Sequence, residues 1–166
     1  MSPQTFIFIG RSGCGKGTQA ELLQAFLKEQ DANVPMYYLE TGKRFRDFIA
    51  QDGYTQTLSK EIMKNGDRQP DFLAVWMWSH LFINDLKGNE HLMIDGTPRS
   101  KGEAMILDNG LKFYKRSNPQ VVYLNVSRAW SEKHLLSRGR ADDSVEGIKK
   151  RLDWFDRDVM PAVEYF

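Results

Sequence analysis

The stretch that decides the fold is Gly10-Arg11-Ser12-Gly13-Cys14-Gly15-Lys16-Gly17-Thr18. It follows an apolar run, Thr5-Phe6-Ile7-Phe8-Ile9, and precedes a stretch of helical character from Gln19 to Gln30. Glycines let the backbone N–H groups of a strand-to-helix turn point at an anion, and the helix start adds the positive end of its dipole. We therefore predict a phosphate-binding loop that handles a nucleoside triphosphate. The alternative is a glycine-rich turn that binds nothing.

The polar side chains of this loop have distinct expected roles. Lys16 would reach the outer phosphates of the nucleotide. The usual pattern places Ser or Thr directly after the lysine, but here Gly17 intervenes, so we expect Thr18 to supply the hydroxyl that helps hold Mg²⁺. Cys14 is the only cysteine, so no disulfide can form within the chain. We interpret it as a small filler in the loop rather than as a reactive thiolate.

Length and composition fit one compact intracellular domain. The chain has 166 residues, of which 41% are hydrophobic and 27% charged, and its formal net charge is +1. This charge argues against general nucleic-acid binding, which needs a strong basic excess. No apolar run approaches the roughly 18 residues that span a bilayer, and the N-terminus has no signal-peptide pattern. We expect a cytoplasmic protein with no nucleic-acid and no membrane partner.

Four short apolar runs predict the strands of a parallel sheet: 6–9, 36–39, 92–94 and 121–126. Each run is nearly continuous in apolar residues instead of alternating, which suits a sheet covered on both faces. Helical stretches separate the runs, so the order βαβαβαβ predicts an α/β fold with helices on both faces of the sheet.

Helical patterns are expected in five places besides the stretch between the last two strands. They are 19–30, two or three short helices within 43–65, 70–86, 127–137 with Ser127 as its N-cap, and a last helix from Asp143. We expect the apolar residues of the first and the long helix to lie in the core. These are Leu22, Leu23, Phe26 and Leu27, then Phe72, Val75, Trp76, Trp78, Leu81 and Phe82. In the last helix Ile148, Leu152, Phe155 and Val159 share one side.

Polar residues follow the second and third predicted strands. Thr41 and Arg46 come after the second strand, and Asp95 and Arg99 come after the third. Ligands of α/β proteins gather beyond the carboxyl ends of the strands, so these residues lie at the expected edge. An acidic residue at this place, beside a phosphate loop, is positioned to hold the water shell of Mg²⁺. A cap or turn role for Asp95 is the alternative.

Two basic segments lie further along the chain, at 137–143 and 149–152. They contain Arg138, Arg140 and Arg151. The guanidinium fork matches phosphate oxygens in pairs and stays charged, as a transferring phosphoryl group requires. Taken alone, a solvated charged turn paired with Asp142 and Asp143 is the favoured interpretation.

Together these segments resemble the adenylate kinase branch of the nucleoside monophosphate kinases, from Phe6 to Phe166. The family's Gly-x-Pro-Gly-x-Gly-Lys-Gly-Thr loop matches Gly10 to Thr18, with Ser12 in place of the proline. The other matches are Thr41, Gly42 and Arg46 to its Thr-Gly-x-x-x-Arg motif, and Asp95, Gly96, Pro98 and Arg99 to its Asp-Gly-x-Pro-Arg motif. The family's short, zinc-free lid and the helix after it resemble Arg138, Gly139-Arg140-x-Asp142-Asp143 and Lys150-Arg151-Leu152.

The resemblance implies one P-loop kinase domain over 1–166, with a monophosphate-binding arm at 41–70 and a short lid at 138–143. It implies transfer of the γ-phosphoryl group of ATP to AMP with Mg²⁺. The implied ATP-binding residues are Gly13, Cys14, Gly15, Lys16, Gly17, Thr18, His134 and Arg138. The implied monophosphate-binding residues are Thr41, Gly42, Arg46, Gln69, Gly96, Arg99, Glu103, Arg140 and Arg151. The implied catalytic residues are Lys16, Arg99, Arg138, Arg140 and Arg151, and Thr18 and Asp95 would hold Mg²⁺ through water.

The sequence departs from the family pattern at the positions that bind the bases of the two nucleotides. Glu103 stands where the family has the glutamine that reads the acceptor adenine. A carboxylate only accepts hydrogen bonds, so it suits the two adjacent donors of guanine, and GMP becomes the rival of AMP. A Glu103 that points to solvent is the alternative. His134 stands where the family has the arginine that stacks on the donor base, so donor selectivity is expected to be loose.

The lid and the end of the chain also differ. The lid has no room for four zinc ligands, and the chain has no spare cysteine, so we expect no zinc. Family members usually continue into a fifth strand and a closing helix, which are not found here, so the chain is either naturally minimal or truncated. The family is monomeric, but an uncovered edge at the fourth strand predicts self-association or a lower stability than that of full-length relatives.

Other functions stay open. CMP, UMP or a metabolite such as shikimate are alternative acceptors. A degenerate kinase fold that binds nucleotide without catalysis is a further alternative.

Overall fold

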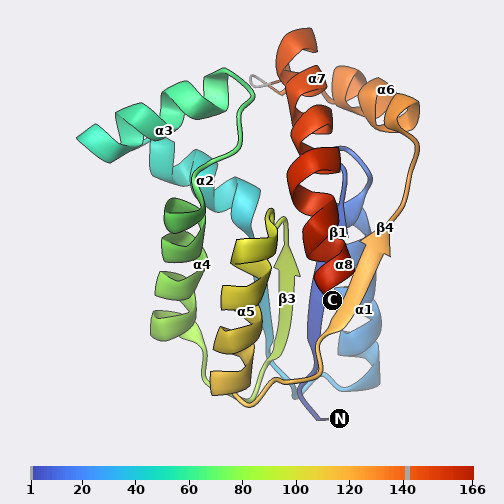
Figure 1. The fold of residues 1–166 in the computed structure, drawn as a ribbon. Helices are drawn as coiled ribbons and strands as arrows, with labels where there is room; N and C mark the ends of the chain where they lie inside the picture. The colour runs from blue at the N-terminus through green and yellow to red at the C-terminus, as the bar shows by residue number, and fades with distance from the viewer. Residues whose placement is uncertain (1, 141–142) are drawn as a thin grey trace.

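A four-stranded parallel sheet forms the middle layer of the molecule, in the order β2-β3-β1-β4 (Figure 1). The computed structural model describes residues 2–140 and 143–166. The strands are β1 Thr5–Gly10, β2 Met36–Glu40, β3 His91–Asp95 and β4 Gln120–Leu124. The predicted α/β class and the four predicted strands are confirmed, although β4 ends at Leu124 instead of Val126.

Helices follow each strand, as the sequence predicts. They are α1 Lys16–Gln30, α2 Thr41–Ile49, α3 Tyr54–Lys64, α4 Asp71–Asp85, α5 Lys101–Phe113, α6 Arg128–Arg138, α7 Val145–Trp154 and α8 Met160–Tyr165. The predicted cap of α6 is confirmed, because the hydroxyl oxygen of Ser127 accepts the N–H of Trp130 at 3.1 Å. The prediction of a single last helix is wrong, because a π-helical turn, η1 Phe155–Val159, joins α7 to α8.

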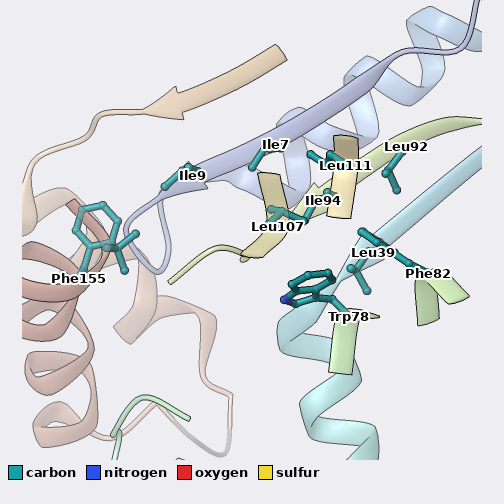
Figure 2. Packing of buried hydrophobic residues seen from close by; sticks show 11 residues of the cluster. Ile7, Ile9, Leu39, Trp78, Phe82, Leu92, Ile94, Leu107, Leu111 and Phe155 are labelled. Atoms are coloured by element: carbon teal, nitrogen blue, oxygen red, sulfur yellow. The ribbon is translucent and has the colours of Figure 1, made fainter. Parts of the chain in front are cut away.

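Helices cover both faces of the sheet (Figure 1). On one face α4, α5 and η1 pack against β1, β2 and β3. The side chains of this cluster that Figure 2 labels are Ile7, Ile9, Leu39, Trp78, Phe82, Leu92, Ile94, Leu107, Leu111 and Phe155. On the other face Ala20 and Leu27 of α1 pack against Phe8 and Met93. The sheet is thus the middle layer of a three-layer sandwich.

The apolar residues of α7 and η1 lie where the sequence predicts. Ile148, Leu152, Phe155 and Val159 are all buried. The two in α7 pack against Leu135 of α6 and so join these two helices.

The predicted core role of several apolar residues is wrong. Phe72 and Trp76 of α4 are 71% and 44% exposed, and Leu22 and Phe26 of α1 are also exposed. The reason is geometric: α4 is apolar on all sides, and the side that carries Trp78 and Phe82 turns toward the sheet. Phe72 and Trp76 lie away from that side, and the ring of Trp76 contacts Phe48 of α2 instead of the sheet.

The two edges of the sheet are β2 and β4. β4 pairs with β1 on one side, from Phe6 opposite Gln120 to Gly10 opposite Leu124. No other strand among residues 2–140 and 143–166 pairs with the second side of β4. No helix in that part of the chain is both long and apolar enough to cross a membrane.

The parallel register brings three loops to one edge of the sheet. Glu40, at the end of β2, lies opposite Asp95 at the end of β3, and Asp95 lies opposite Phe8 of β1. The phosphate loop therefore lies beside the loops that follow β2 and β3. The sequence placed these residues on one edge, and the register shows that they are neighbours.

Candidate functional site

The loop from Gly10 to Gly15 has the left-handed turns that glycine favours. Gly13 and Gly15 have φ values of 79° and 92°. A Cβ on Gly13 would lie 2.8 Å from Cγ of Leu135 in α6, so α6 packs directly on the loop. Gly15 is the N-cap of α1, which places the backbone N–H groups of the loop at the helix N-terminus. The arrangement is that of an anion-binding loop.

The two side chains inside this loop contact each other. Lys16 Nζ donates hydrogen bonds to the carbonyl oxygens of Gly10 at 3.0 Å and Arg11 at 3.1 Å. It also lies 3.7 Å from Sγ of Cys14, which is buried. A Cβ on Gly10 would come within 2.6 Å of that sulfur, so the thiol fills the space beside the glycine. This packing agrees with a filler role for Cys14.

A cleft of about 600 Å³ opens above the loop. Of the residues with an expected role, those that line it are Gly13, Gly15, Lys16, Gly17, Thr18, Gly42, Arg46, Gln69, Asp95, Gly96, Arg99, His134, Arg138, Arg140 and Arg151. Three others, Cys14, Thr41 and Glu103, are buried and do not line it. One cavity thus contains the phosphate loop and arginines from four segments of the chain.

Asp95 closes β3 at the floor of this cleft. Its carboxylate is 6% exposed and accepts a hydrogen bond from the Tyr38 hydroxyl at 3.1 Å. Burial raises the pKa of Asp95, and the charge of Lys16 opposes this rise. Burial and the neighbouring carboxylate also raise the pKa of Tyr38, so its hydroxyl keeps its proton and donates. Asp95 is therefore part of the cleft floor and not a helix cap.

The arginines of α6 and α7 are held together by Asp143. Arg138 donates to both oxygens of this carboxylate at 2.9 Å, and Arg151 donates to one of them at 2.5 Å. Partial burial alone would raise the pKa of Asp143, but the two guanidinium groups hold it below its usual value. Pairing with Asp143 is part of the charged-turn alternative, yet both arginines also line the cleft. Ala141 and Asp142, within the predicted lid at 138–143, lie outside the described residues.

Two more arginines line the cleft near β2 and β3. Arg46 of α2 pairs with Glu40 at 2.8 Å. Arg99 donates from Nε to the carbonyl oxygen of Gly96 at 2.6 Å. Burial lowers the pKa of Arg99, although an arginine remains protonated at any physiological pH.

Two residues with an expected acceptor role have other hydrogen bonds. The Thr41 hydroxyl lies 2.9 Å from the hydroxyl of Thr97, which joins the loops after β2 and β3. Gln69 is buried, and its amide group is bonded to Ser59 through both the side chain and the backbone carbonyl at 2.9 Å. Both residues thus contribute to the structure of the loops that carry the arginines.

Glu103 lies in the first turn of α5 and is completely buried. One carboxylate oxygen accepts the backbone N–H of Arg99 at 2.6 Å, and the Glu103 N–H donates to the Ser100 hydroxyl at 3.0 Å. This is a reciprocal cap of the kind that begins many helices. The alternative in which Glu103 points to solvent is therefore wrong.

His134 of α6 lies at the rim of the cleft on a second aromatic ring. Its imidazole stacks on Trp130, with ring centroids 3.6 Å apart and planes at 21°. Its Nδ1 atom lies 3.2 Å from the carbonyl oxygen of Trp130. His134 lines the cleft, and one face of its ring is covered by Trp130.

Among the cleft-lining residues that sequence reasoning missed are Tyr38, Glu40 and Trp154. Tyr38 and Glu40 are two apart at the end of β2 and so point to the same face of the sheet. Their place directly before Thr41 was a usable signal. Trp154 ends a helix far along the chain, and no local pattern connects it with the cleft.

A phosphate loop at the carboxyl edge of a parallel sheet, facing a cleft rich in arginine, defines the class of P-loop phosphotransferases that act on nucleotides. Comparison with known proteins narrows this class. The model of the adenylate kinase family matches residues 8–166, so the chain belongs to this family. It is an ATP-dependent nucleoside monophosphate kinase, and the resemblance inferred from the motifs is confirmed.

Individual relatives agree with this assignment. The chain is 34% identical over 160 residues to an adenylate kinase of Prochlorococcus marinus strain MIT 9515, which covers 96% of this chain and 82% of the relative. It is 31% identical, with the same coverage, to that of strain MIT 9301. It is 29% identical over 164 residues to an adenylate kinase of Oenococcus oeni, which covers 98% of this chain and 84% of the relative.

Proposed function

We propose that this protein transfers the γ-phosphoryl group of ATP to AMP and so forms two molecules of ADP. The observation that supports this most strongly is the single cleft that contains the phosphate loop and arginines from four segments. Two polyanions can meet there with their charges offset from several sides. We place the reaction in the cytoplasm, where both nucleotides are available.

The phosphate loop would hold the donor. Its backbone N–H groups and Lys16 would contact the β- and γ-phosphates of ATP. A hard cation needs oxygen ligands, and the buried carboxylate of Asp95 and the hydroxyl of Thr18 line the cleft next to Lys16. These residues fit a Mg²⁺ ion held through water, which would neutralise charge on the donor phosphates.

The arginines would hold the acceptor and the transferring group. Arg46 and Arg99 come from the loops after β2 and β3 and would clamp the phosphate of AMP. Arg138 at the end of α6, Arg140 just after it and Arg151 in α7 would stabilise the charge on the transferring group. The acceptor oxygen is already an anion, so no general base is needed. Exclusion of water is needed, because ATP would otherwise be hydrolysed.

We assign the exclusion of water to two segments. The arm at 41–70 contains α2 and α3, and the short lid at 138–143 joins α6 to α7. Each contributes arginine to the cleft, so closure over bound substrate would bring these charges to the phosphates together.

GMP remains a second candidate acceptor only because Glu103 stands where the family has a base-reading glutamine. In the structure Glu103 is buried, accepts the N–H of Arg99 and does not line the cleft, so this position gives GMP no advantage over AMP. At the donor site, the His134 ring, supported on one face by Trp130, would stack on any purine. We therefore expect ATP to be replaceable by GTP with a modest loss.

One screen tests the proposed function. Formation of diphosphate is measured with AMP, GMP, CMP and UMP as acceptors and with ATP and GTP as donors, with and without Mg²⁺. We expect AMP with ATP and Mg²⁺ to be the best combination, and Lys16→Met to lower its rate by about a thousandfold while the fold is retained. Binding of ATP without any diphosphate would favour a non-catalytic role, and a preference for GMP would favour the second candidate.

We also propose that the protein associates with itself along the free side of β4. An edge strand presents unpaired backbone N–H and C=O groups that another chain can pair with.

A further inference from the structure

Trp154 is the last residue of α7, and it contacts two other residues that line the cleft, Arg99 and Gly66. It lines the cavity three residues after Arg151 on the same helix, and so on a neighbouring part of the helix surface. The side chain is half-buried. Nothing in the proposed chemistry requires an aromatic ring there.

The ring of Trp154 faces the guanidinium of Arg99. Cζ of Arg99 lies 5.9 Å from the ring centroid, within the range of a cation–π contact. Besides this contact, Nε of Arg99 donates to the carbonyl oxygen of Gly96. The hydrogen bond fixes one edge of the guanidinium, and the aromatic ring limits how the group can rotate about it.

The indole N–H of Trp154 contacts a second segment. It donates to the carbonyl oxygen of Gly66 at 3.1 Å, although the two residues are 88 positions apart. Gly66 follows α3, and a Cβ there would lie 2.5 Å from Cα of Gly147 in α7. The backbones of the α3 loop and of α7 therefore touch, and the indole N–H lies at this contact.

Two ion pairs lie beside this contact. Lys150 of α7 lies 3.9 Å from Asp67, and Arg68 lies 3.4 Å from Asp158 of η1. The first pair is well exposed and long, so its contribution is small. The half-buried indole is better placed to fix the position of residues 66–68 against α7.

We propose that Trp154 is a positioning residue for the acceptor. Its ring orients Arg99 toward the acceptor phosphate, and its N–H keeps the loop after α3 docked on α7. The inference rests on the proposed function, because that function assigns the acceptor phosphate to Arg99. It adds a residue that acts through Arg99 and is not itself in contact with the phosphate.

Two variants separate the contributions of the ring and the N–H. Trp154→Phe keeps an aromatic ring and loses the donor, and Trp154→Leu loses both. We expect KM for AMP to rise about threefold in the first variant and about tenfold in the second. KM for ATP should stay within about twofold in both, because the cleft residue that the Trp154 ring faces, Arg99, is assigned to the acceptor. Trp76→Leu, at an exposed tryptophan outside the cleft, is the matched control.

A double-mutant cycle tests whether Trp154 acts through Arg99. In an Arg99→Ala background, Trp154→Leu should raise KM for AMP by less than about threefold, because no guanidinium is left to orient. The inference is overturned if Trp154→Leu leaves KM for AMP within about twofold, raises KM for both substrates equally, or has its full effect without Arg99.

Binding measurements separate this inference from the proposed function. Calorimetric titration with AMP should show the same tenfold loss of affinity in Trp154→Leu, without any turnover. A wild-type protein that binds AMP but forms no ADP would reject the proposed function, while this titration would still decide the role of Trp154. If Trp154→Leu does not fold, the titration of Trp154→Phe tests the inference. An affinity of Trp154→Phe for AMP equal to that of the wild type overturns the role of the N–H.

Discussion

Glu103 has two neighbours that decide its behaviour, the backbone of Arg99 and the hydroxyl of Ser100. Burial raises the pKa of its carboxyl group, and the hydrogen bond from Arg99 opposes the rise. A buried carboxylate in a helix cap is thus kept at a cost in desolvation. Glutamine would accept the same hydrogen bond without that cost.

We therefore predict that Glu103→Gln makes stability less dependent on pH. In the unfolded chain Glu103 loses its proton near pH 4.3, at about its ordinary pKa, but in the folded protein it keeps the proton to higher pH. Between these values the folded state binds more protons, so the free energy of unfolding falls as pH rises. Glu103→Gln lacks this loss of stability, which amounts to about 1.4 kcal/mol for each unit by which the pKa is raised in the folded protein.

Thermal unfolding between pH 4 and pH 8 measures this effect. The melting temperature of Glu103→Gln should rise relative to the wild type as pH increases. Glu29→Gln, at an exposed position of α1, should show no such trend. Parallel pH profiles for the wild type and Glu103→Gln would show that the buried carboxyl is not a proton-binding group.

The sequence predicts the positions of some residues of the cleft but not of others. Lys16 and Thr18 lie within one contiguous motif, so their placement in the cleft could be predicted from the residues around them. The positions of Asp95 and Arg99 could be predicted from the strand that precedes them. Trp154 could not, because its partners Gly66 and Arg99 are distant in sequence, and only the packing of α7 brings the three together.

The α6–α7 pair depends on one carboxylate. The side chain of Asp143 is 1% exposed and lies between Arg138 at the end of α6 and Arg151 in α7. Ser144 caps α7 through a hydrogen bond from the N–H of Gly147 at 3.0 Å. The two helices thus present their arginines to the cleft from a fixed junction.

We predict that Asp143→Asn lowers both turnover and stability. The amide cannot neutralise two guanidinium groups, so these lose their common orientation toward the transferring phosphoryl group. We expect kcat to fall by about tenfold or more, and the free energy of unfolding at pH 7 to fall by about 2 kcal/mol. Because the pKa of Asp143 is lowered by its partners, the stability it provides is present above about pH 3.9 and is lost as pH falls below that value.

Steady-state kinetics and denaturant unfolding measure the two effects. Asp153→Asn is the matched control, since Asp153 pairs with Arg128 at 2.7 Å in an exposed position of α7. Asp153→Asn should change neither the free energy of activation for turnover nor the free energy of unfolding by more than about 0.5 kcal/mol. An Asp143→Asn enzyme with the kcat of the wild type would show that Asp143 does not orient the arginines.

Elements show the limits of periodicity. The apolar side of α7 and η1 could be read from spacing, because Ile148, Leu152, Phe155 and Val159 are all buried. The π-helical turn could not, because the four-residue spacing from Phe155 to Val159 fits one turn of either an α-helix or a π-helix. In α4 the pattern is apolar all round, so periodicity could not show that Phe72 is exposed.

The whole fold followed from the order of strands and helices and from one loop. Continuous apolar runs predicted a sheet covered on both faces, and the structure has helices on both. The sheet order could not be derived from the runs themselves. It depends on which crossovers pass over which face, and this is decided by long-range packing of α1, α4 and α5.

The free side of β4 leads to a prediction about assembly. Helix α1 packs on the same face of the sheet as Val122 and Leu124 of β4, and Leu22 and Phe26 lie one turn apart on this helix. Both are more than half exposed, at 60% and 53%. An unpaired strand edge and an exposed apolar pair on a helix that packs on the same sheet face favour pairing with a second copy.

Light scattering over a range of concentrations measures this association. We expect the mass of the wild type to rise from 19.2 kDa toward twice that value as concentration increases. The double variant Leu22→Glu, Phe26→Glu should stay at 19.2 kDa, because charges added to this exposed apolar surface of α1 oppose its burial against a second copy. Phe72→Glu, at the exposed aromatic of α4, controls for a general effect of added charge and should associate like the wild type. A wild type that keeps the mass of one chain at every concentration would show that the edge of β4 remains unpaired.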